Sequence, residues 1–206
     1  MEKTEQAAVI HRSRLTTRQI TKISALAVMA FVLMILEIGI PFFPGFLKLD
    51  LSDLPALIGA FAMGPIAGIL IQFVKVVLHG IFRSWSGGVG ELANFMVGVF
   101  YVVPAALVYH YKKDQKHAVI GMLVGTVFMT LLGSFANYYV LIPMYSRFMP
   151  IELIVDMGTV VNPRIVDVKT LVMYGIAPFN VFKGLTIGVL TLLIYKRISP
   201  LLKEKH

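Results

Sequence analysis

The chain of 206 residues contains no cysteine, which excludes disulfides, thiolate zinc sites, iron–sulfur clusters held by cysteine and cysteine nucleophiles. It also lacks a G-x-x-x-x-G-K-[ST] phosphate-binding loop and an H-E-x-x-H zinc motif. Its five histidines show no ligand spacing, and no local motif suggests a Ser-His-Asp arrangement. The sequence therefore predicts no enzyme activity, no metal site and no bound cofactor.

Charged residues are scarce, at 15% of the chain, whereas 57% of the residues are apolar and the mean hydropathy is +0.80. Soluble domains are about 45–50% apolar, because a small domain must cover its surface with polar groups. The apolar residues here fall in runs that suit a hydrocarbon layer of about 30 Å. We therefore expect an all-α integral membrane bundle with the lipid bilayer as its solvent.

Six apolar segments are separated by proline, glycine or charged connectors, which predicts six transmembrane helices in one transmembrane domain, residues 1–206. Residues 1–18 form a polar, basic tail. The second helix is too short for a full span, and a turn at Gly64 and Pro65 separates it from the third. The predicted helices cover residues 19–40, 53–63, 66–82, 91–111, 118–142 and 168–195.

The basic residues are distributed unequally between the two sides of the predicted bundle. Twelve of the 19 lie in residues 1–22, the 112–116 connector and the C-terminal tail, all on one side. Because lysine and arginine accumulate in cytoplasmic loops, both termini should be cytoplasmic, which requires an even number of spans. The net charge of +8 thus reflects membrane topology, and we expect no nucleic-acid partner.

Polar side chains inside the apolar spans usually face a bundle interior and often mark a substrate path, because they are costly in hydrocarbon. Lys183 lies well inside the last span, and Asn180 shares its helix face three residues earlier. Asn94, Asn137 and Lys75 lie toward the outer ends of three other spans. The sequence therefore predicts a polar-lined cavity that opens to the outside.

Each of these residues also has a structural alternative. Lys183 could pair with a carboxylate such as Glu37 or extend its ammonium to an interface. Lys75 could pair with Glu91 or Asp50, and the asparagines could form hydrogen bonds between helices. The sequence alone leaves these alternatives open.

Small residues indicate where helices approach closely. A patch in the first helix, Ala25, Ala27 and Ala30, could face a neighbouring helix or another subunit. Three G-x-x-x-G patterns should pack helices within the bundle: Gly64 with Gly68, Gly121 with Gly125, and Gly184 with Gly188.

Three stretches carry a family resemblance: residues 51–57 (LSDLPAL) with 64–68 (GPIAG), 137–145 (NYYVLIPMY) and 177–184 (APFNVFKG). Here the chain resembles the substrate-binding S-components of energy-coupling factor (ECF) vitamin importers, most closely the riboflavin-specific ones. The resemblance covers nearly the whole chain. It implies six helices in a bacterial plasma membrane and capture of riboflavin from outside. It also implies partners, a membrane T-component and two ATPases that drive uptake.

The resemblance also implies site residues, with the loop after the first helix capping the ligand. Ala25, Ala27 and Ala30 would dock the T-component, although the family's Ala-x-x-x-Ala pattern is absent because Met29 and Phe31 stand four residues after Ala25 and Ala27. The expected ligand-binding residues are Asn180, Lys183, Asn137, Asn94, Leu47, Phe43, Phe179 and Lys75.

Riboflavin suits these residue types. Its ring system is flat, largely apolar and uncharged, and its polar edge has one N–H donor among several acceptors. An asparagine amide offers both a donor and an acceptor, and a lysine ammonium can donate to ring acceptors. The alternative function is a stand-alone, ion-coupled secondary transporter. It would need a membrane-embedded carboxylate, for which Glu37 is the main candidate, and the sequence shows no inverted repeat.

Overall fold

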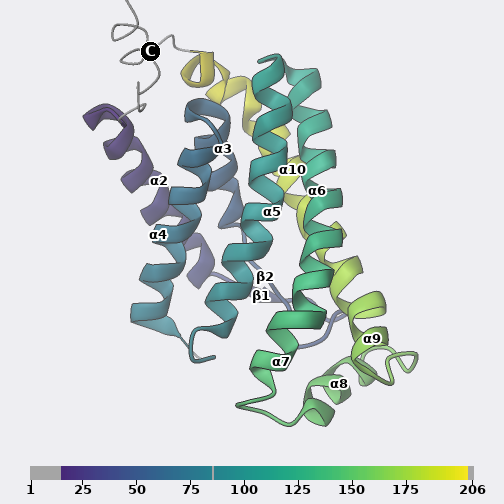
Figure 1. The fold of residues 1–206 in the computed structure, drawn as a ribbon. Coiled ribbons are helices and arrows are strands. Elements are labelled where there is room, and N and C mark those ends of the chain that lie inside the picture. Colours follow the sequence, from purple (N-terminus) through teal and green to yellow (C-terminus); the bar gives the residue numbers. More distant parts are fainter. Residues whose placement is uncertain (1–14, 85, 204–206) are drawn as a thin grey trace, which may run out of the picture.

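The structure, a computed structural model, describes residues 15–84 and 86–203 and is a bundle of roughly parallel and antiparallel helices (Figure 1). Five apolar stretches in this part of the chain are long enough to cross a membrane: Thr17–Ile35 (α2), Pro65–Arg83 (α4), Val89–Tyr111 (α5), Gln115–Tyr145 and Val168–Ile194. The all-α membrane bundle predicted from the sequence is confirmed.

The predicted count of six spans is not reproduced among the described residues. The sixth apolar helix, α3 (Asp53–Met63), has 11 residues. At 1.5 Å per residue it is about half the length needed to cross a hydrocarbon layer of about 30 Å. Gly64, with φ of 102°, ends α3, and Pro65 begins α4. α3 is therefore a short helix packed inside the bundle.

The first helix ends earlier than predicted. A capping box between Thr16 and Gln19 starts α2, which stops at Ile35 rather than at residue 40. The chain then forms β1 (Ile38–Gly39), which pairs antiparallel with β2 (Lys48–Leu49). This hairpin folds the intervening loop back toward the bundle. Residues 1–14 of the predicted N-terminal tail lie outside the described residues.

Two helices widen into π turns next to a proline. α6 (Gln115–Ala136) continues through η2 (Asn137–Leu141) into α7 (Ile142–Tyr145), with Pro143 in the new turn. α9 (Val168–Leu171) likewise continues through η3 (Val172–Ile176) into α10 (Ala177–Lys203), with Pro178 in its first turn. Because proline lacks an N–H group and crowds the preceding turn, a wider turn accommodates it. Asn137 is the first residue of η2, and Asn180 lies in the first turn of α10, four residues after the end of η3.

Glycines allow three helices to pack closely. A Cβ atom at Gly121 would lie 2.5 Å from the backbone oxygen of Ala105, and one at Gly125 would overlap the backbone of Tyr101. A Cβ at Gly184 would lie 2.6 Å from the hydroxyl of Thr126. These contacts confirm that the second and third G-x-x-x-G patterns pack helices, here α6 against α5 and α10 against α6.

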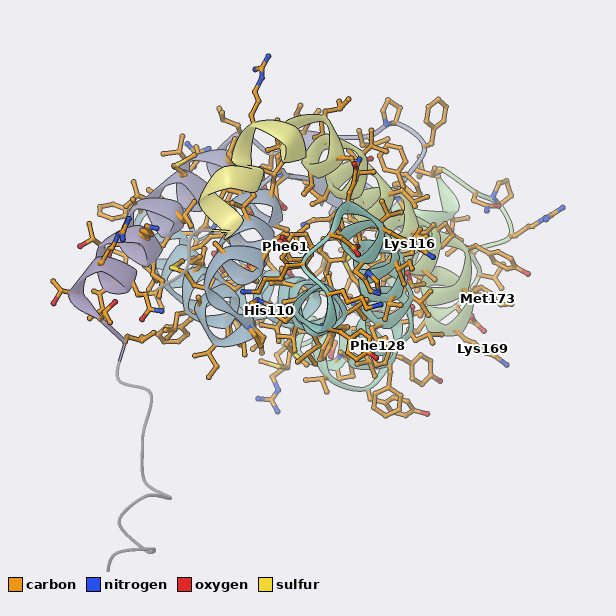
Figure 2. The ribbon with its side chains drawn as sticks, turned by 90° about the horizontal axis from the view of Figure 1, so that it is seen from above. Phe61, His110, Lys116, Phe128, Lys169 and Met173 are labelled. Atoms are coloured by element: carbon orange, nitrogen blue, oxygen red, sulfur yellow. The ribbon has the colours of Figure 1, made fainter. Side chains whose placement is uncertain are left out.

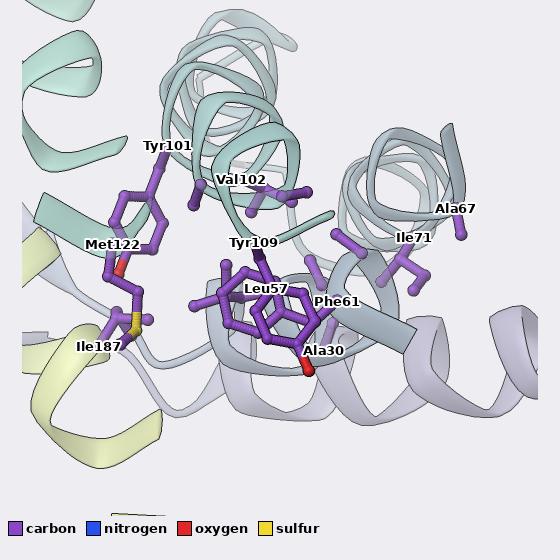
Figure 3. Close-up of a cluster of buried hydrophobic side chains, with 14 of the residues drawn as sticks. Ala30, Leu57, Phe61, Ala67, Ile71, Tyr101, Val102, Tyr109, Met122 and Ile187 are labelled. Atoms are coloured by element: carbon purple, nitrogen blue, oxygen red, sulfur yellow. The ribbon is translucent and has the colours of Figure 1, made fainter. Parts of the chain in front are cut away.

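The main hydrophobic core lies where α2 to α6 and α10 converge (Figure 3). The rings of Phe61 and Tyr109 stack with centroids 4.4 Å apart. Viewed along the bundle in Figure 2, Phe128 and Met173 lie at the periphery, where they are 46% and 60% exposed, as expected for side chains that face lipid. The bundle is therefore apolar both inside and outside.

The predicted docking patch on α2 requires a correction. Ala27 and Ala30 are fully buried in the main core, so a partner cannot reach them in this conformation. Only Ala25 of the three is exposed. Ala27 and Ala30 instead fit the alternative role: their small side chains let α2 pack closely against the other helices of the main core.

The two ends of the bundle differ. The start of α2 and the end of α10 lie at one end, and α7, α8 (Ile151–Thr159) and α9 lie at the other (Figure 1). A second, smaller core holds this other end together, formed by residues such as Ile154, Ile165 and Leu171. The β1–β2 hairpin lies between the ends.

Candidate functional site: a polar-floored cavity

A cavity of about 560 Å³ lies between the end of α2, the loop after it, and the elements α4, α5, η2, α7 and α10. Its volume is within the usual range for small-molecule sites, about 300–1,000 Å³. Its apolar walls include Met34, Phe46, Leu47, Val97, Ile176 and Phe179. Its polar lining residues are Glu37, Lys48, Asp50, His79, Ser86, Glu91, Asn94, Asn137, Asn180 and Lys183.

Six of the eight residues expected to bind the ligand line this cavity: Asn180, Lys183, Asn137, Asn94, Leu47 and Phe179. Phe43 lies behind the wall, with its ring centroid 5.3 Å from that of Phe179 and 5.7 Å from that of Phe182. Lys75 is fully buried beneath the cavity and does not line it.

Four buried charges form a cluster at the floor of the cavity, where Asp50 and Lys183 line it and Asp53 and Lys75 lie beneath them. The ammonium of Lys183 lies 2.9 Å from Asp50 Oδ2 and 3.0 Å from Asp53 Oδ2, and that of Lys75 lies 3.0 Å from Asp53 Oδ1. Each of the four residues is at most 4% exposed. Two carboxylates therefore balance two ammonium groups, which makes burial of all four possible.

These ion pairs differ from the alternatives that the sequence suggested. Glu37 pairs with Lys48 and not with Lys183, and Glu91 pairs with His79 and not with Lys75. The fold explains the difference. The loop after β2 passes under the cavity and brings Asp50 and Asp53, the first residue of α3, close to Lys75 and Lys183. Asp50 and Lys183 meet there although they are 133 residues apart in the sequence.

Neutral side chains complete the floor. Lys75 donates to the hydroxyl of Ser52 at 2.8 Å, and Gln72 Nε2 donates to Asp53 at 2.8 Å. Asn94 Nδ2 donates to Asp50 Oδ2 at 3.1 Å. The cluster thus joins the loop after β2 to α4, α5 and α10 at once.

Asp50 lies in the segment between α2 and α3, outside the spanning helices. Burial alone would raise the pKa of this carboxyl, but the charge of Lys183 and the hydroxyl of Ser52 outweigh it and hold the pKa below the ordinary value. The Asp50 carboxylate therefore remains ionised at neutral pH and holds Lys183 in place.

Asn94 and Asn180 each keep one unused hydrogen-bonding atom. Asn94 Oδ1 and Asn180 Nδ2 are buried and have no hydrogen-bond partner among the described residues. Asn137 differs, because its Nδ2 donates to the backbone oxygen of Gly133 at 2.8 Å. Buried polar atoms without partners are rare in folded proteins. Both atoms belong to residues that line the cavity.

A second polar group lies where α4 and α5 meet. His79 Nδ1 is 2.9 Å from Glu91 Oε1, and the Ser86 hydroxyl donates to Glu91 Oε2 at 3.2 Å. The N–H of Gly90 donates to Ser86 Oγ at 2.7 Å and fixes that hydroxyl. We refer to His79, Ser86 and Glu91 as the Glu91 group. The sequence did not identify it as part of the site.

A helical membrane bundle with one such polar-floored cavity defines a membrane-embedded protein that binds a small molecule. The family model described as "ECF transporter, substrate-specific component" matches residues 18–195. The chain therefore belongs to the substrate-specific components of ECF transporters. This membership places it among membrane transport proteins rather than enzymes, as the sequence predicted.

Relatives agree with this assignment. The riboflavin transporter RibU of Staphylococcus aureus (strain TCH60) is 36% identical over 91% of this chain and 93% of its own length. The riboflavin transporter FmnP of Bacillus subtilis (strain 168) is 34% identical over 92% of this chain and 96% of its own length. A solved structure described as the S component of a bacterial ECF transporter has a TM-score of 0.72 and 34% identity, covering 91% of this chain and 98% of that one.

Proposed function

We propose that this chain captures riboflavin from outside the cell and presents it for ATP-driven uptake by a membrane T-component and two ATPase subunits. The named function of the relatives supports this substrate. The absence of a phosphate-binding loop in the sequence fits a subunit that relies on partners for ATP hydrolysis. Riboflavin would be a transported ligand and not a cofactor.

The observation that carries the proposal is the arrangement of Asn180 and Lys183 on one face of α10 at the cavity floor. An ammonium has three donors. Lys183 donates one hydrogen bond to Asp50 and lies in an ion pair with Asp53. A remaining donor can bind an acceptor on the polar edge of the flavin ring. The unused atoms of Asn180 and Asn94 add a donor and an acceptor. This set complements an edge with one N–H among several acceptors.

The apolar walls suit the rest of the ring system. Leu47 and Phe46 come from the loop after α2, and Phe179 and Ile176 come from the start of α10 and the turn before it. Phe43 supports Phe179 from behind. A flat aromatic ligand between these side chains would be largely shielded from water, while its polar edge would meet the floor.

The proposed orientation places both termini in the cytoplasm. Two observations support it: the excess of basic residues in the tails and in the 112–116 connector, and the position of the start of α2 and the end of α10 at the same end of the bundle (Figure 1). The Ser86 and Phe148 side of the cavity lies toward the opposite end, so the cavity would open outward.

An ion-coupled secondary transporter is not favoured. Its main candidate carboxylate, Glu37, forms an ion pair with Lys48, whose side chain is 45% exposed, and lies outside the spanning helices. A coupling carboxylate would instead be expected at membrane depth.

Uptake measurements separate the two functions. Radiolabelled riboflavin uptake is measured in cells that express this chain with ECF partner subunits, after ATP depletion and, separately, after collapse of the proton gradient at constant ATP. The proposal predicts that uptake stops in the first case and persists in the second. Uptake that follows the ion gradient and ignores ATP would contradict it.

A further inference from the structure

Gly133 of α6 differs from the glycines that pack the bundle. A Cβ atom at Gly121 or Gly125 would overlap the backbone of α5. At Gly133, the three nearest atoms that a Cβ would meet all belong to side chains: Asn180 Nδ2 at 2.9 Å, Val97 Cγ2 at 3.5 Å and Asn180 Cγ at 3.9 Å. Because Asn180 and Val97 both line the cavity, the missing Cβ makes room for the wall of the site and not for the backbone of a neighbouring helix.

The carbonyl of Gly133 holds a second asparagine of the cavity. Asn137 lies one turn further along the chain and donates through Nδ2 to the Gly133 oxygen at 2.8 Å. Asn180 Nδ2, in contrast, has no hydrogen-bond partner among the described residues and lies against the α-carbon of Gly133. Gly133 therefore contacts two cavity-lining asparagines, one through its carbonyl and one through the space that a side chain would fill.

Resting on the proposed riboflavin function, we propose that Gly133 is a positioning residue that sets where the Asn180 amide meets the ligand. A methyl group at this position would push the amide away by roughly 0.5 Å, from 2.9 Å to the lower limit of ordinary contact, 3.4 Å. Amide hydrogen bonds have lengths of about 2.7–3.2 Å, and the groups of a binding site must be held to within about 0.5 Å. A displacement of this size weakens or breaks the bond from Asn180 to the ligand.

The effect of the same methyl group on folding has the opposite sign. Gly133 lies inside α6 and is not among the glycines with positive φ, so alanine fits its backbone conformation. Alanine is favoured over glycine inside a helix, because glycine loses more conformational freedom on folding. The methyl would meet the ends of the Asn180 and Val97 side chains, which can shift without separating the helices. Gly133→Ala should thus weaken ligand binding without lowering stability.

The first test measures both quantities on matched variants. Purified parent, Gly133→Ala and Gly80→Ala proteins are titrated with riboflavin by quenching of flavin fluorescence, and their thermal midpoints are measured without ligand. Gly80 lies in α4, where an added Cβ would meet Glu91 Cγ at an ordinary 3.8 Å, so it controls for replacing a glycine in a helix. We expect Gly133→Ala to weaken binding by about threefold to tenfold, as for one lost hydrogen bond, with a midpoint no lower than that of the parent. Gly80→Ala should keep the affinity within about twofold of the parent.

The second test asks whether Gly133 acts through Asn180. Asn180→Ala removes the amide that the new methyl would displace, so adding Gly133→Ala to it should cost no further affinity. We expect the double variant to bind riboflavin within about twofold of Asn180→Ala alone. A further loss in the double variant, as large as the loss in Gly133→Ala alone, would show that Gly133 acts independently of Asn180 and would overturn the inference.

The outcomes separate this inference from the proposed function. A parent protein that binds no riboflavin contradicts the proposed function, and the inference falls with it. A parent that binds riboflavin, with an affinity that Gly133→Ala leaves unchanged, contradicts only the role of Gly133. Loss of affinity together with a lower thermal midpoint would make Gly133 a packing residue like Gly125 and would also overturn the inference.

Discussion

Lys183 is predicted to have two separable roles, one in folding and one in ligand binding. Replacing Lys183 by methionine removes the ammonium that lies within 3.0 Å of both Asp50 and Asp53. The floor would then hold two buried carboxylates against the single charge of Lys75. Breaking a buried pair in this way costs about 3–5 kcal/mol of stability. We therefore expect Lys183→Met to lower the thermal midpoint markedly and to weaken riboflavin binding.

The double variant Lys183→Met with Asp50→Asn separates the two roles. It leaves one carboxylate, Asp53, for one ammonium, Lys75, so most of the lost stability should return. The donor that Lys183 offers the ligand is still missing, and a hydrogen bond to a charged group is worth about 1.5–3 kcal/mol. Riboflavin binding should thus stay weaker by about tenfold to hundredfold.

The assay measures both quantities on the same preparations. Thermal midpoints in detergent come from size-exclusion chromatography after heating, and dissociation constants come from flavin fluorescence quenching. Asp50→Asn alone is the matched control for the loss of that carboxylate. A double variant that regains both stability and parental affinity would refute a direct contact between Lys183 and the ligand.

Three further predictions rest on individual contacts. Asn180→Ala should weaken riboflavin binding by about tenfold in the same titration while leaving the thermal midpoint nearly unchanged, because the Nδ2 group of Asn180 has no partner among the described residues. Gly125→Val should force α6 away from the Tyr101 backbone, lower the free energy of unfolding by about 1–3 kcal/mol and so lower the thermal midpoint. A variant with the midpoint of the parent would show that α5 and α6 can separate without cost. Asp167→Ala should destabilise the start of α9, because the Asp167 carboxylate accepts from the backbone N–H and the hydroxyl of Thr170, which lowers its pKa. Because the folded-state pKa of Asp167 is lowered, this stabilisation is present at neutral pH and is lost as the pH falls through that pKa. The thermal midpoints of parent and variant should therefore differ at pH 7 and converge in acid.

The membrane class and most helices could be predicted from the sequence because they depend on local signals. The short helix at residues 53–63 follows from prolines and a glycine that break it on each side, and the structure gives the same bounds. The end of α2 was predicted incorrectly because the residues up to 40, apart from Glu37, remain apolar. The chain leaves the helix there to pair Ile38 with Leu49 in the hairpin, and helical periodicity does not reveal such pairing.

The site was predicted less completely, because several of its contacts join residues that lie far apart in the sequence. Asn180 and Lys183 were found because polar residues stand out in an apolar span. The role of Asp50 and Asp53 as partners of Lys183 depends on a loop that folds under the cavity, and the carboxylates lie outside the last span. Glu91 was considered only as a partner of Lys75, and the approach of α4 and α5 shows that it pairs instead with His79 at the cavity.

The central claim is that this chain alone binds riboflavin in the cavity described above. The most direct measurement is the absorption spectrum of the purified chain after incubation with riboflavin and removal of free ligand, followed by quantification of the flavin released on denaturation. We predict a flavin spectrum and about one riboflavin per chain, and loss of both in the Asn180→Ala, Lys183→Ala double variant. A colourless parent protein that releases no flavin, although it is folded and monodisperse, would contradict the account.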